Sequence, residues 1–303
     1  MHVIGVGEIL WDLIGGSEYL GGAVLNFSVH STRLGHRVSL VSAVGDDERG
    51  RLALSRARDL GLSTRFIRTV PNHPTGTVTV TVDAGGQPSY VIHRPAAYDF
   101  AALDDADYAA LAAAAPDWIA FGTLHSMHPN ARQLLRAVIQ AFPHARRFYD
   151  INLRRDSYTP ELIAGLFEVA HVVKLNEAEV GTVGEVFATL ETTLEAFCRS
   201  NAARFGWQAV CVTRGGEGCV LLLGGEYVEV PGYRVTVADT VGAGDAFAAA
   251  LLHGIQAGWP PREVADFANR LGALVASRSG GVPAWSPDEL WGVRREVGSI
   301  HPT

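Results

Sequence analysis

Apolar residues recur along this chain with two different spacings. Short apolar runs, such as residues 38–44 and 118–121, are followed by stretches in which apolar residues lie three or four positions apart, such as 130–142. The first spacing predicts buried strands and the second predicts amphipathic helices. Strands that alternate with helices are typical of a mainly parallel sheet covered by helices on both faces. We therefore predict a three-layer α/β/α fold for most of the chain.

The same alternation continues to the C-terminal part of the sequence. Gly61 follows one predicted helix directly, and glycine is a typical residue just after a helix end. Strands are predicted over residues 148–151, 171–175 and 210–213, and helices over 48–60, 109–115, 160–169, 177–187, 190–205, 242–256, 262–277 and 287–297.

One segment has a strict period of two instead. Residues 77–82 read TVTVTV, and a second short run, 89–93, follows after a turn that contains two glycines. This is the pattern of a β-hairpin, and alternating threonine and valine suit a sheet with one face exposed to water. Inside an α/β chain the hairpin predicts a small β excursion from the main sheet.

The composition limits the classes of function. The chain has 303 residues, 48% of them hydrophobic, and 32 acidic against 25 basic residues give a formal net charge of −7. This length and apolar fraction suit one large α/β domain or two small domains with a sizeable core. A nucleic-acid binder is disfavoured, because phosphate contacts need clustered lysine and arginine. Net acidity does not exclude a nucleotide ligand, whose charge can be met by backbone N–H groups and a metal ion.

The compartment is constrained as well. Cys198, Cys211 and Cys219 show no CxxC spacing, so we expect buried reduced thiols and neither a disulfide framework nor a zinc site. The first residues include Glu8 and Asp12 and no basic segment before them, which predicts a first strand and not a signal peptide. No apolar run reaches the roughly 18 residues of a membrane span. We expect a cytoplasmic protein with no membrane partner.

Two widespread nucleotide-binding motifs are missing from the sequence. It contains no GxxxxGK[ST] phosphate-binding loop. Gly5 and Gly7, after the first strand, lack the third glycine of a dinucleotide-binding fingerprint, so we interpret them as residues that allow close packing of that strand. A nicotinamide-dependent dehydrogenase is disfavoured for the same reason.

The strongest chemical signal is the segment Asp239-Thr-Val-Gly242-Ala243-Gly244-Asp245, which precedes an apolar helical stretch. Small residues let successive backbone N–H groups turn toward one point, and the positive end of the helix dipole adds to them. Such a place suits an anion, and a carboxylate beside it suits a base that takes a proton from a hydroxyl. The residues alone leave a second interpretation open, in which Asp245 only caps the helix and the glycines form a tight turn.

This segment, read on as DTVGAGDAF, resembles the C-terminal signature of the ribokinase-like sugar kinases, the PfkB family. Other segments agree with that family in order and spacing, so the resemblance covers nearly the whole chain. They are residues 21–28 with 33–35 and 44–47, an NxxE motif at 176–179 and a TxGxxG motif at 213–218. The resemblance implies a ribokinase-like fold and transfer of a phosphoryl group from ATP.

By this resemblance, Asp245 is the catalytic base. The N–H groups of Gly242, Ala243 and Gly244 are then expected to form an anion hole for the transferred γ-phosphoryl group.

The resemblance also assigns residues to the nucleotide and to cations. Asn176 and Glu179 match positions that handle Mg²⁺ and the phosphates in the family, usually through water. The expected ATP contacts are Thr213, Gly215, Gly218 and Asn269. The positions that often surround a monovalent cation in the family, with K⁺ as the candidate, are Asp239, Val241, Val275, Arg278 and Gly280.

By the same resemblance, the residues expected to bind the sugar are Asp12, Gly22 and Asn26. A carboxylate can accept hydrogen bonds from two neighbouring hydroxyls, and an amide can both donate and accept. The chain departs from the usual family pattern at Val24 and Leu25, which are bulkier than the residues common there. This departure leaves the identity of the sugar open, and not the reaction.

The predicted hairpin gains a role from the resemblance. Residues 75–98, with 10–20 as their partner, correspond to a discontinuous β lid that covers the sugar and excludes water. Residues 1–303 then form a single α/β domain that carries this lid. A lid sheet with one apolar face would also suit a homodimer formed through the lid.

Three further residues follow from local similarity to fructokinases and to the family. IHRPAAYDF resembles fructokinases and brings Arg94 toward the sugar, and YDINLR places Asn152 and Arg154 near the transferred phosphate.

His125 and His128 follow the strand at 118–121, at the end where α/β sheets bind ligands. These two histidines are candidates for a substrate contact and not for a metal site.

We therefore expect an enzyme that transfers the γ-phosphoryl group of ATP, with Mg²⁺, to the primary hydroxyl of a sugar. Fructose is the first choice, and ribose, 2-keto-3-deoxygluconate and a nucleoside remain open. The alternative of another class is an inactive regulatory protein that binds sugar or nucleotide.

Overall fold

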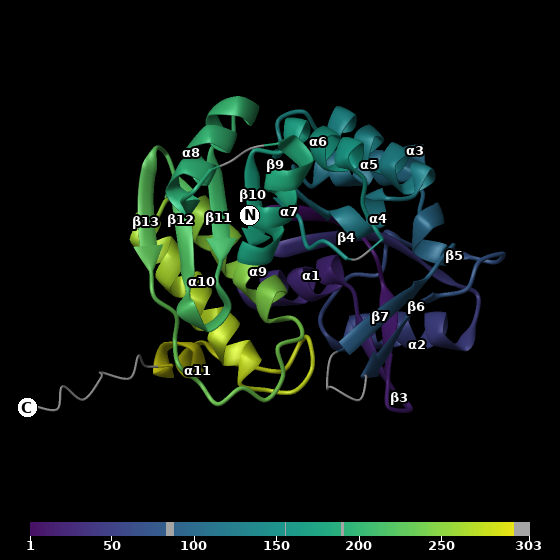
Figure 1. Ribbon diagram of the computed structural model, residues 1–303. Helices are drawn as coiled ribbons and strands as arrows, with labels where there is room; N and C mark the ends of the chain where they lie inside the picture. The colour runs from purple at the N-terminus through teal and green to yellow at the C-terminus, as the bar shows by residue number, and fades with distance from the viewer. Residues whose placement is uncertain (83–87, 155, 189–190, 294–303) are drawn as a thin grey trace, which may run out of the picture.

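The strands of the main sheet lie side by side in the middle of the molecule (Figure 1). The computed structural model describes residues 1–82, 88–154, 156–188 and 191–293. Nine strands follow one another in the order β13-β12-β11-β10-β9-β8-β1-β4-β5. They are β1 (His2–Val6), β4 (Arg37–Gly45), β5 (Ile67–Val70), β8 (Trp118–Gly122), β9 (Arg146–Asp150), β10 (Val172–Asn176), β11 (Ala209–Thr213), β12 (Cys219–Leu223) and β13 (Glu226–Val230).

The strand directions confirm the predicted, mainly parallel sheet. All neighbours from β5 to β11 pair in parallel, and only β12 and β13 at one edge are antiparallel. The chain order reverses beside β1, which pairs with β4 on one side and with β8 on the other. In α/β sheets, ligands bind beyond the carboxyl ends of the strands at such a switch point.

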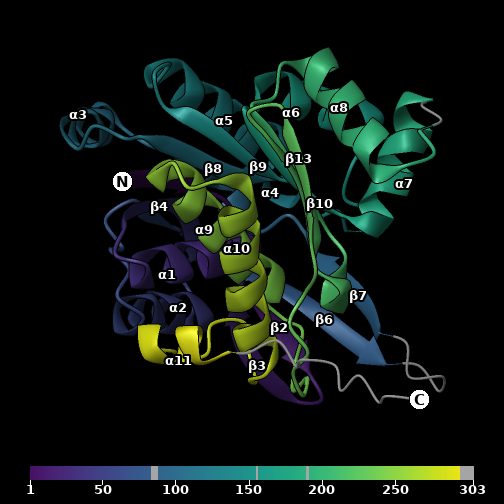
Figure 2. The ribbon, with the colours of Figure 1, turned by 90° about the vertical axis from the view of Figure 1, so that its left-hand side faces the viewer.

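Helices cover both faces of this sheet, as the sequence predicted (Figure 2). The core on one face contains residues of α3 (Asp105–Ala113), α5 (Pro129–Ala141), α6 (Pro160–Val169), α7 (Glu177–Phe187) and α8 (Leu194–Phe205). The opposite face is covered by α1 (Ala23–Arg33), α2 (Glu48–Asp59), α9 (Ala243–Ala257), α10 (Pro261–Ala276) and α11 (Pro287–Gly292). α8 begins at Leu194 and α11 ends at Gly292, so both are shorter than the expected helices 190–205 and 287–297; residues 190 and 294–297 lie outside the described part of the chain.

A second, smaller sheet is built from two separate parts of the chain. Its order is β3-β2-β6-β7, with β2 (Leu10–Ile14), β3 (Ser17–Gly21), β6 (Gly76–Val82) and β7 (Pro88–His93). β6 and β7 form the expected hairpin, and β2 pairs in parallel with β6. The predicted glycine turn at 83–87 lies outside the described residues. One face of this sheet is anchored through Val78, which packs with Leu10 and Tyr98.

Local packing explains two of the weaker sequence signals. A Cβ atom on Gly7 would lie 2.3 Å from a methyl carbon of Val24, so the glycine lets β1 approach α1, as expected for strand packing. Cys198, Cys211 and Cys219 are buried, as expected. No helix within the described ranges is both long and apolar enough to cross a membrane.

Candidate active site

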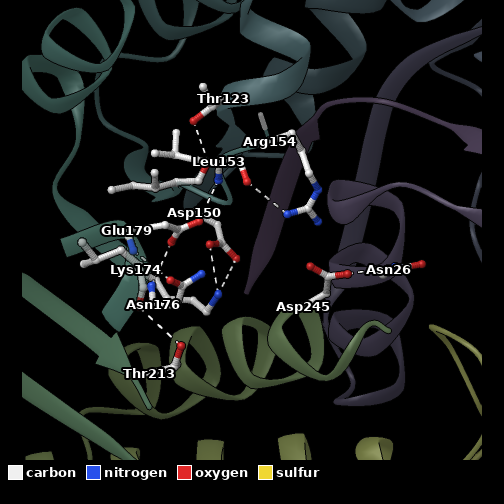
Figure 3. A network of polar contacts seen from close by, with 12 residues as sticks. Asn26, Thr123, Asp150, Leu153, Arg154, Lys174, Asn176, Glu179, Thr213 and Asp245 are labelled. Carbon is white, nitrogen blue, oxygen red and sulfur yellow. Dashed lines mark hydrogen bonds and ion pairs between the residues drawn. The ribbon is translucent and has the colours of Figure 1, made fainter. Parts of the chain in front are cut away.

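The carboxyl ends of β9, β10 and β11 bring a group of polar side chains to the first turn of α9 (Figure 3). Asp150, Asn176 and Thr213 are the last residues of these three strands. Asp245 faces them from α9, and α1 lies beside α9 with Asn26 in its first turns. Residues far apart in the sequence thus meet at one edge of the sheet.

Asp245 is buried at this edge and held by one side chain. It is 8% exposed, and Asn26 Nδ2 donates a hydrogen bond to its Oδ2 at 2.8 Å. Burial and the nearby Asp150 carboxylate raise its pKa to about 7, against the opposing effects of Asn26, Lys174 and Arg154. The helix N-cap is Gly242, which has no side-chain cap bond. The capping interpretation of Asp245 therefore explains little of its geometry.

Gly242 turns the chain into α9 through a left-handed conformation, with φ 74°. A Cβ atom there would lie 2.1 Å from the carbonyl oxygen of Gly281, so only glycine fits between the two segments. The backbone N–H groups in this first turn have no partner within the helix and point outward.

Ala243 departs from the expected three-amide anion hole. Its N–H donates to Thr240 O at 3.3 Å, which closes the turn before the helix. In the described part of the chain, the N–H groups of Gly242 and Gly244 have no such acceptor. These two amides are therefore the ones left to face an anion.

Lys174 and Asp150 form a buried ion pair that the sequence reasoning missed. Lys174 Nζ lies 3.0 and 2.9 Å from the two carboxylate oxygens of Asp150, and the side chains are 8% and 13% exposed. Burial works against the ammonium ion, but the charges of Asp150 and Glu179 outweigh it and raise the pKa of Lys174. One signal was available, because Lys174 is the only lysine in the sequence and every other basic residue is an arginine.

The NxxE motif has a local structural explanation. Asn176 caps α7 by accepting from Glu179 N at 2.9 Å, and Glu179 Oε2 accepts from Asn176 N at 2.8 Å. This is a reciprocal capping box. The second carboxylate oxygen of Glu179 accepts from Leu153 N at 2.7 Å, and burial raises the pKa of this group. Glu179 therefore ties the β9–α6 connection to α7.

The oxygen donors at this edge fit Mg²⁺. That ion prefers oxygen ligands and keeps several waters, so it needs only one or two carboxylates besides phosphate oxygens. Glu179 supplies such a carboxylate, and the Asn176 amide oxygen lies beside it. Among the described residues, no group of three His, Cys, Asp or Glu side chains forms a cage that would hold a metal ion.

The expected nucleotide residues lie along one side of the site. Thr213 is the Cα partner of Asn176 across the β10–β11 pair. Gly215 begins a short 3₁₀ turn, Gly215–Glu217, and Gly218 follows with φ 102°. A Cβ atom on Gly218 would lie 2.2 Å from Val230 O, so the glycine is needed for the loop to pack. Asn269 in α10 holds the same region from behind, since its Nδ2 donates to Val230 O at 3.2 Å.

The expected sugar residues lie where the small sheet meets α1. Burial raises the pKa of Asp12 to about 6, and the positive charge of Arg154 opposes this rise. Gly22 has φ 120° and a Cβ atom on it would lie 2.4 Å from Glu8 O. Glu8 is a buried carboxylate that the sequence reasoning did not assign, and it accepts from Ala23 N at 2.8 Å. The positive charge of Arg154 also lowers the pKa values of Glu8 and Asp245, so this arginine acts on all three carboxyl groups.

The side chain of Arg94 already has hydrogen-bond partners within the protein. Its guanidinium forms an ion pair with the fully buried Asp99 and donates to Leu124 O at 2.8 Å. Asn152 adopts a left-handed conformation, with φ 42°, in the connection after β9.

The segments expected around a monovalent cation do come together. Asp239 Oδ1 accepts from Val241 N and its Oδ2 accepts from Gly280 N, both at 3.0 Å. Val275 O accepts from Arg278 N at 3.0 Å, and the Arg278 guanidinium donates to Ala284 O. The carboxylate of Asp239 thus joins the loop before α9 to the loop after α10.

His125 and His128 have structural partners. His125 is fully buried with Nε2 3.1 Å from Tyr98 O, and His128 caps α5 by accepting from Asn130 N. The Nδ1 atom of His125 is buried and has no hydrogen-bond partner among the described residues.

Comparison with known proteins agrees with this architecture. The model of the family described as pfkB family carbohydrate kinase matches residues 14–288. The uncharacterized sugar kinase PH1459 from Pyrococcus horikoshii is 30% identical over 95% of this chain and 94% of its own length. Its crystal structure in complex with ATP has a TM-score of 0.81, over 96% of this chain and 97% of that one.

Two fructokinases are also similar to this chain. The Escherichia coli fructokinase is 29% identical over 87% of this chain and 88% of its own length. The structure of a fructokinase from Xylella fastidiosa with bound ATP has a TM-score of 0.84 at 22% identity, over 96% of this chain and 97% of that one.

Proposed function

Because the chain belongs to the pfkB family of carbohydrate kinases, it is a phosphotransferase with an alcohol acceptor, and we propose that its acceptor is the primary hydroxyl of fructose. The observation that carries the reaction is the position of Asp245. This carboxylate is buried in the first turn of α9, with a pKa of about 7, beside the amides of Gly242 and Gly244. A base next to a set of N–H donors is the arrangement that phosphoryl transfer requires.

The chemistry of the step follows from these residues. Asp245 accepts the proton of the sugar hydroxyl as its oxygen attacks the γ-phosphorus, and the bond from that phosphorus to ADP breaks. The amides of Gly242 and Gly244 stabilise the negative charge of the transferring group. Mg²⁺ would be held by Glu179 through water, with Asn176 beside it, and would neutralise charge on the phosphates. Asn26 keeps Asp245 oriented toward the acceptor through its 2.8 Å hydrogen bond.

The acceptor lies, in this proposal, between Asp12, Gly22 and Asn26. The Oδ1 atom of Asn26 is buried, and no hydrogen-bond donor for it is present among the described residues. A buried acceptor without a donor is unfavourable, and a sugar hydroxyl would satisfy it. The small sheet would close over the acceptor as a lid, which limits hydrolysis of ATP by water. ATP would lie along Thr213, Gly215, Gly218 and Asn269.

The choice of fructose rests on local similarity and on the named relatives. Residues 92–100 and 149–154 resemble the corresponding fructokinase segments, and several fructokinases match most of the chain at 27–29% identity. Ribose, 2-keto-3-deoxygluconate and nucleosides are the competing acceptors. K⁺ is proposed to bind where Asp239 joins the loops before α9 and after α10.

An ADP-release assay over these acceptors, with and without K⁺, tests the proposal. We expect the highest kcat/KM with fructose, a gain on adding K⁺, and a fall in kcat of roughly 10²–10⁴-fold in Asp245→Asn. Higher kcat/KM with another sugar would overturn the acceptor assignment. Near-normal turnover in Asp245→Asn would overturn the assignment of the base, and silence with every acceptor while ATP still binds would favour a binding protein.

A further inference from the structure

The chain's single lysine occupies an unusual place in the main sheet. Its neighbours in β10 alternate between the two cores, with Val173 and Leu175 in the core under α5–α8 and Val172 in the core under α9 and α10. Successive side chains of a strand point to opposite faces, so Lys174 faces α9. That face is otherwise apolar at this level, since Cys211, the partner of Lys174 on β11, belongs to the same core. Burying an ammonium ion there is costly and calls for an explanation.

The ion pair with Asp150 explains only part of this placement. Lys174 and Asp150 are Cα partners in the β9–β10 pair, and Lys174 Nζ donates one hydrogen bond to each carboxylate oxygen of Asp150. An ammonium group carries three N–H donors. Within the described part of the chain the third donor has no acceptor of its own.

The position of Gly244 shows where the ammonium group lies. A Cβ atom on Gly244 would be 3.6 Å from Lys174 Nζ, and outside its own turn of helix no other atom of the described residues would lie within 4 Å of it. The lysine therefore meets the N-terminal turn of α9, which carries the positive end of the helix dipole. A cation is unfavourable at that end of a helix unless an anion lies between them. The ammonium group and the amides of Gly242 and Gly244 thus converge on one anion site.

A buried cation near the anion site offsets the negative charge of the carboxyl groups there. Asp150, Glu179 and Asp245 place three carboxyl groups at the same edge, and Lys174 is the buried basic residue that faces them (Figure 3). A polyphosphate brought to this edge meets repulsion from those carboxylates.

We infer that Lys174 is a further catalytic residue, whose ammonium group donates a hydrogen bond to a non-bridging oxygen of the transferring phosphoryl group. This inference rests on the proposed phosphoryl transfer at the same site. The lysine stays protonated throughout, while Asp245 takes the hydroxyl proton and ADP leaves with the electron pair of the broken P–O bond. Asp150 is a positioning residue that holds the ammonium group toward the anion site.

Two variants separate this role from a structural ion pair. Lys174→Met removes the cation but leaves Asp150 buried without its partner, so we pair it with the double variant Lys174→Met, Asp150→Asn. A purely structural pair predicts that the double variant recovers activity, because no buried charge is left uncompensated. The inference predicts that kcat stays about 10²–10³-fold low in both variants, with the sugar KM within about threefold of the unmodified enzyme. Recovery of kcat in the double variant would overturn it.

Lys174→Arg and Arg68→Met serve as controls. Lys174→Arg keeps the positive charge and is expected to retain more activity than Lys174→Met. Arg68→Met removes the basic partner of another buried aspartate, Asp107. This ion pair joins β5 to α3, away from the site, so we expect the variant to leave kcat unchanged. Equal activity of the Arg and Met variants at Lys174 would contradict a charge-based role.

A binding measurement gives an answer that does not depend on turnover. Isothermal titration of ADP with Mg²⁺, with and without aluminium fluoride, compares the enzyme with and without a mimic of the transferring phosphoryl group. We expect aluminium fluoride to tighten ADP binding in the unmodified protein and in Arg68→Met, and to have little effect in Lys174→Met. An equal gain in Lys174→Met would overturn the inference even if no sugar were turned over. Absence of turnover in the unmodified protein would count against the proposed function alone.

Discussion

Asn26 Nδ2 donates to Asp245 Oδ2 at 2.8 Å, a hydrogen bond between residues that lie 219 positions apart in the sequence. It joins the first turns of α1 and α9, the helix that follows the small sheet's first hairpin and the helix that carries the base. Because the amide is a donor to the ionised carboxylate, it both orients the base and favours its charged form. The Oδ1 atom of the same asparagine is buried and has no hydrogen-bond donor among the described residues.

The pH profile of the reaction should report the pKa of Asp245. A base must be ionised to accept a proton, and the pKa of this carboxyl is raised to about 7 by burial and by Asp150. We expect kcat/KM to be level above about pH 7 and to fall about tenfold per pH unit well below it. A profile that stays level down to pH 5 in an ADP-release assay would show that another group limits the reaction.

Asp245→Asn should stabilise the protein as it inactivates it. The carboxyl ionises at about 7 in the folded state and at about 3.8 in the unfolded state, so the unfolded state loses its proton first and stability falls as pH rises through this window. The neutral asparagine avoids that loss. We expect a gain in unfolding free energy of about 2–4 kcal/mol at pH 8 and almost none at pH 4, measured by urea unfolding. A variant less stable than the unmodified protein at pH 8 would contradict the raised pKa.

Asn26→Leu should move the acid limb of the pH profile to higher pH. Without the amide donor the ionised form of Asp245 loses a hydrogen bond, so its pKa rises further, by about one to two pH units. We expect a lower kcat at pH 7.5 that recovers in part at pH 9.

Asn201→Leu is the matched control for Asn26→Leu. Its Nδ2 donates to Phe197 O inside α8, so it is a buried asparagine with no contact to the site. It should lower stability and leave the midpoint of the pH profile in place. An equal shift in both variants would mean that the shift comes from general destabilisation.

Gly242→Ala should damage catalysis, and Gly258→Ala should not. Both glycines are left-handed, with φ 74° and 71°, at the two ends of α9. A Cβ atom at 242 would lie 2.1 Å from Gly281 O, whereas nothing lies within 4 Å of one at 258. We expect Gly258→Ala to cost about 1–2 kcal/mol of stability with normal kcat. Gly242→Ala should lower kcat at least tenfold, because the turn that presents the amides must shift; equal kcat in the two variants would argue against this role of the turn.

His30→Leu should lower kcat with little effect on either KM. Trp285 Nε1 is 3.1 Å from His30 Nδ1 and can only donate, so Nε2 carries the proton and donates to Gly281 O at 3.1 Å. His30 thus holds the segment that backs Gly242. We expect roughly a tenfold loss in His30→Leu and partial recovery in His30→Gln, whose amide can donate to the same carbonyl.

His36→Leu is the control for that substitution. His36 bonds His253 at 2.8 Å and belongs to a separate, half-buried pair. His36→Leu should lower the stability of the protein about as much as His30→Leu does, and it should leave kcat unchanged. If His30→Gln is as slow as His30→Leu, the hydrogen bond to Gly281 is not what matters.

Much of the fold was predictable because its signals are local in the sequence. The alternation of apolar runs with amphipathic stretches identified the strands β8–β11 and the helices α5–α7, and the TVTVTV period identified β6. The capping box of Asn176 and Glu179 spans four residues and could be recognised in the same way. Short-range hydrogen bonds and periodicity depend on neighbouring residues, so they can be inferred before the tertiary structure is known.

The sequence by itself determined the fold class and, through its motifs, the family, and it singled out Asp245 as the proposed base. Only the tertiary structure decided which side chains reach that base. Asn26 comes from α1, Lys174 from the middle of the sheet and Gly281 from the loop after α10. Such contacts depend on how the layers pack, and a pKa depends on burial and on the sum of nearby charges. The pKa of Asp245, the turning of Ala243 away from the anion site and the meeting of Lys174 with Gly244 are properties of that packing, and no stretch of sequence contains them.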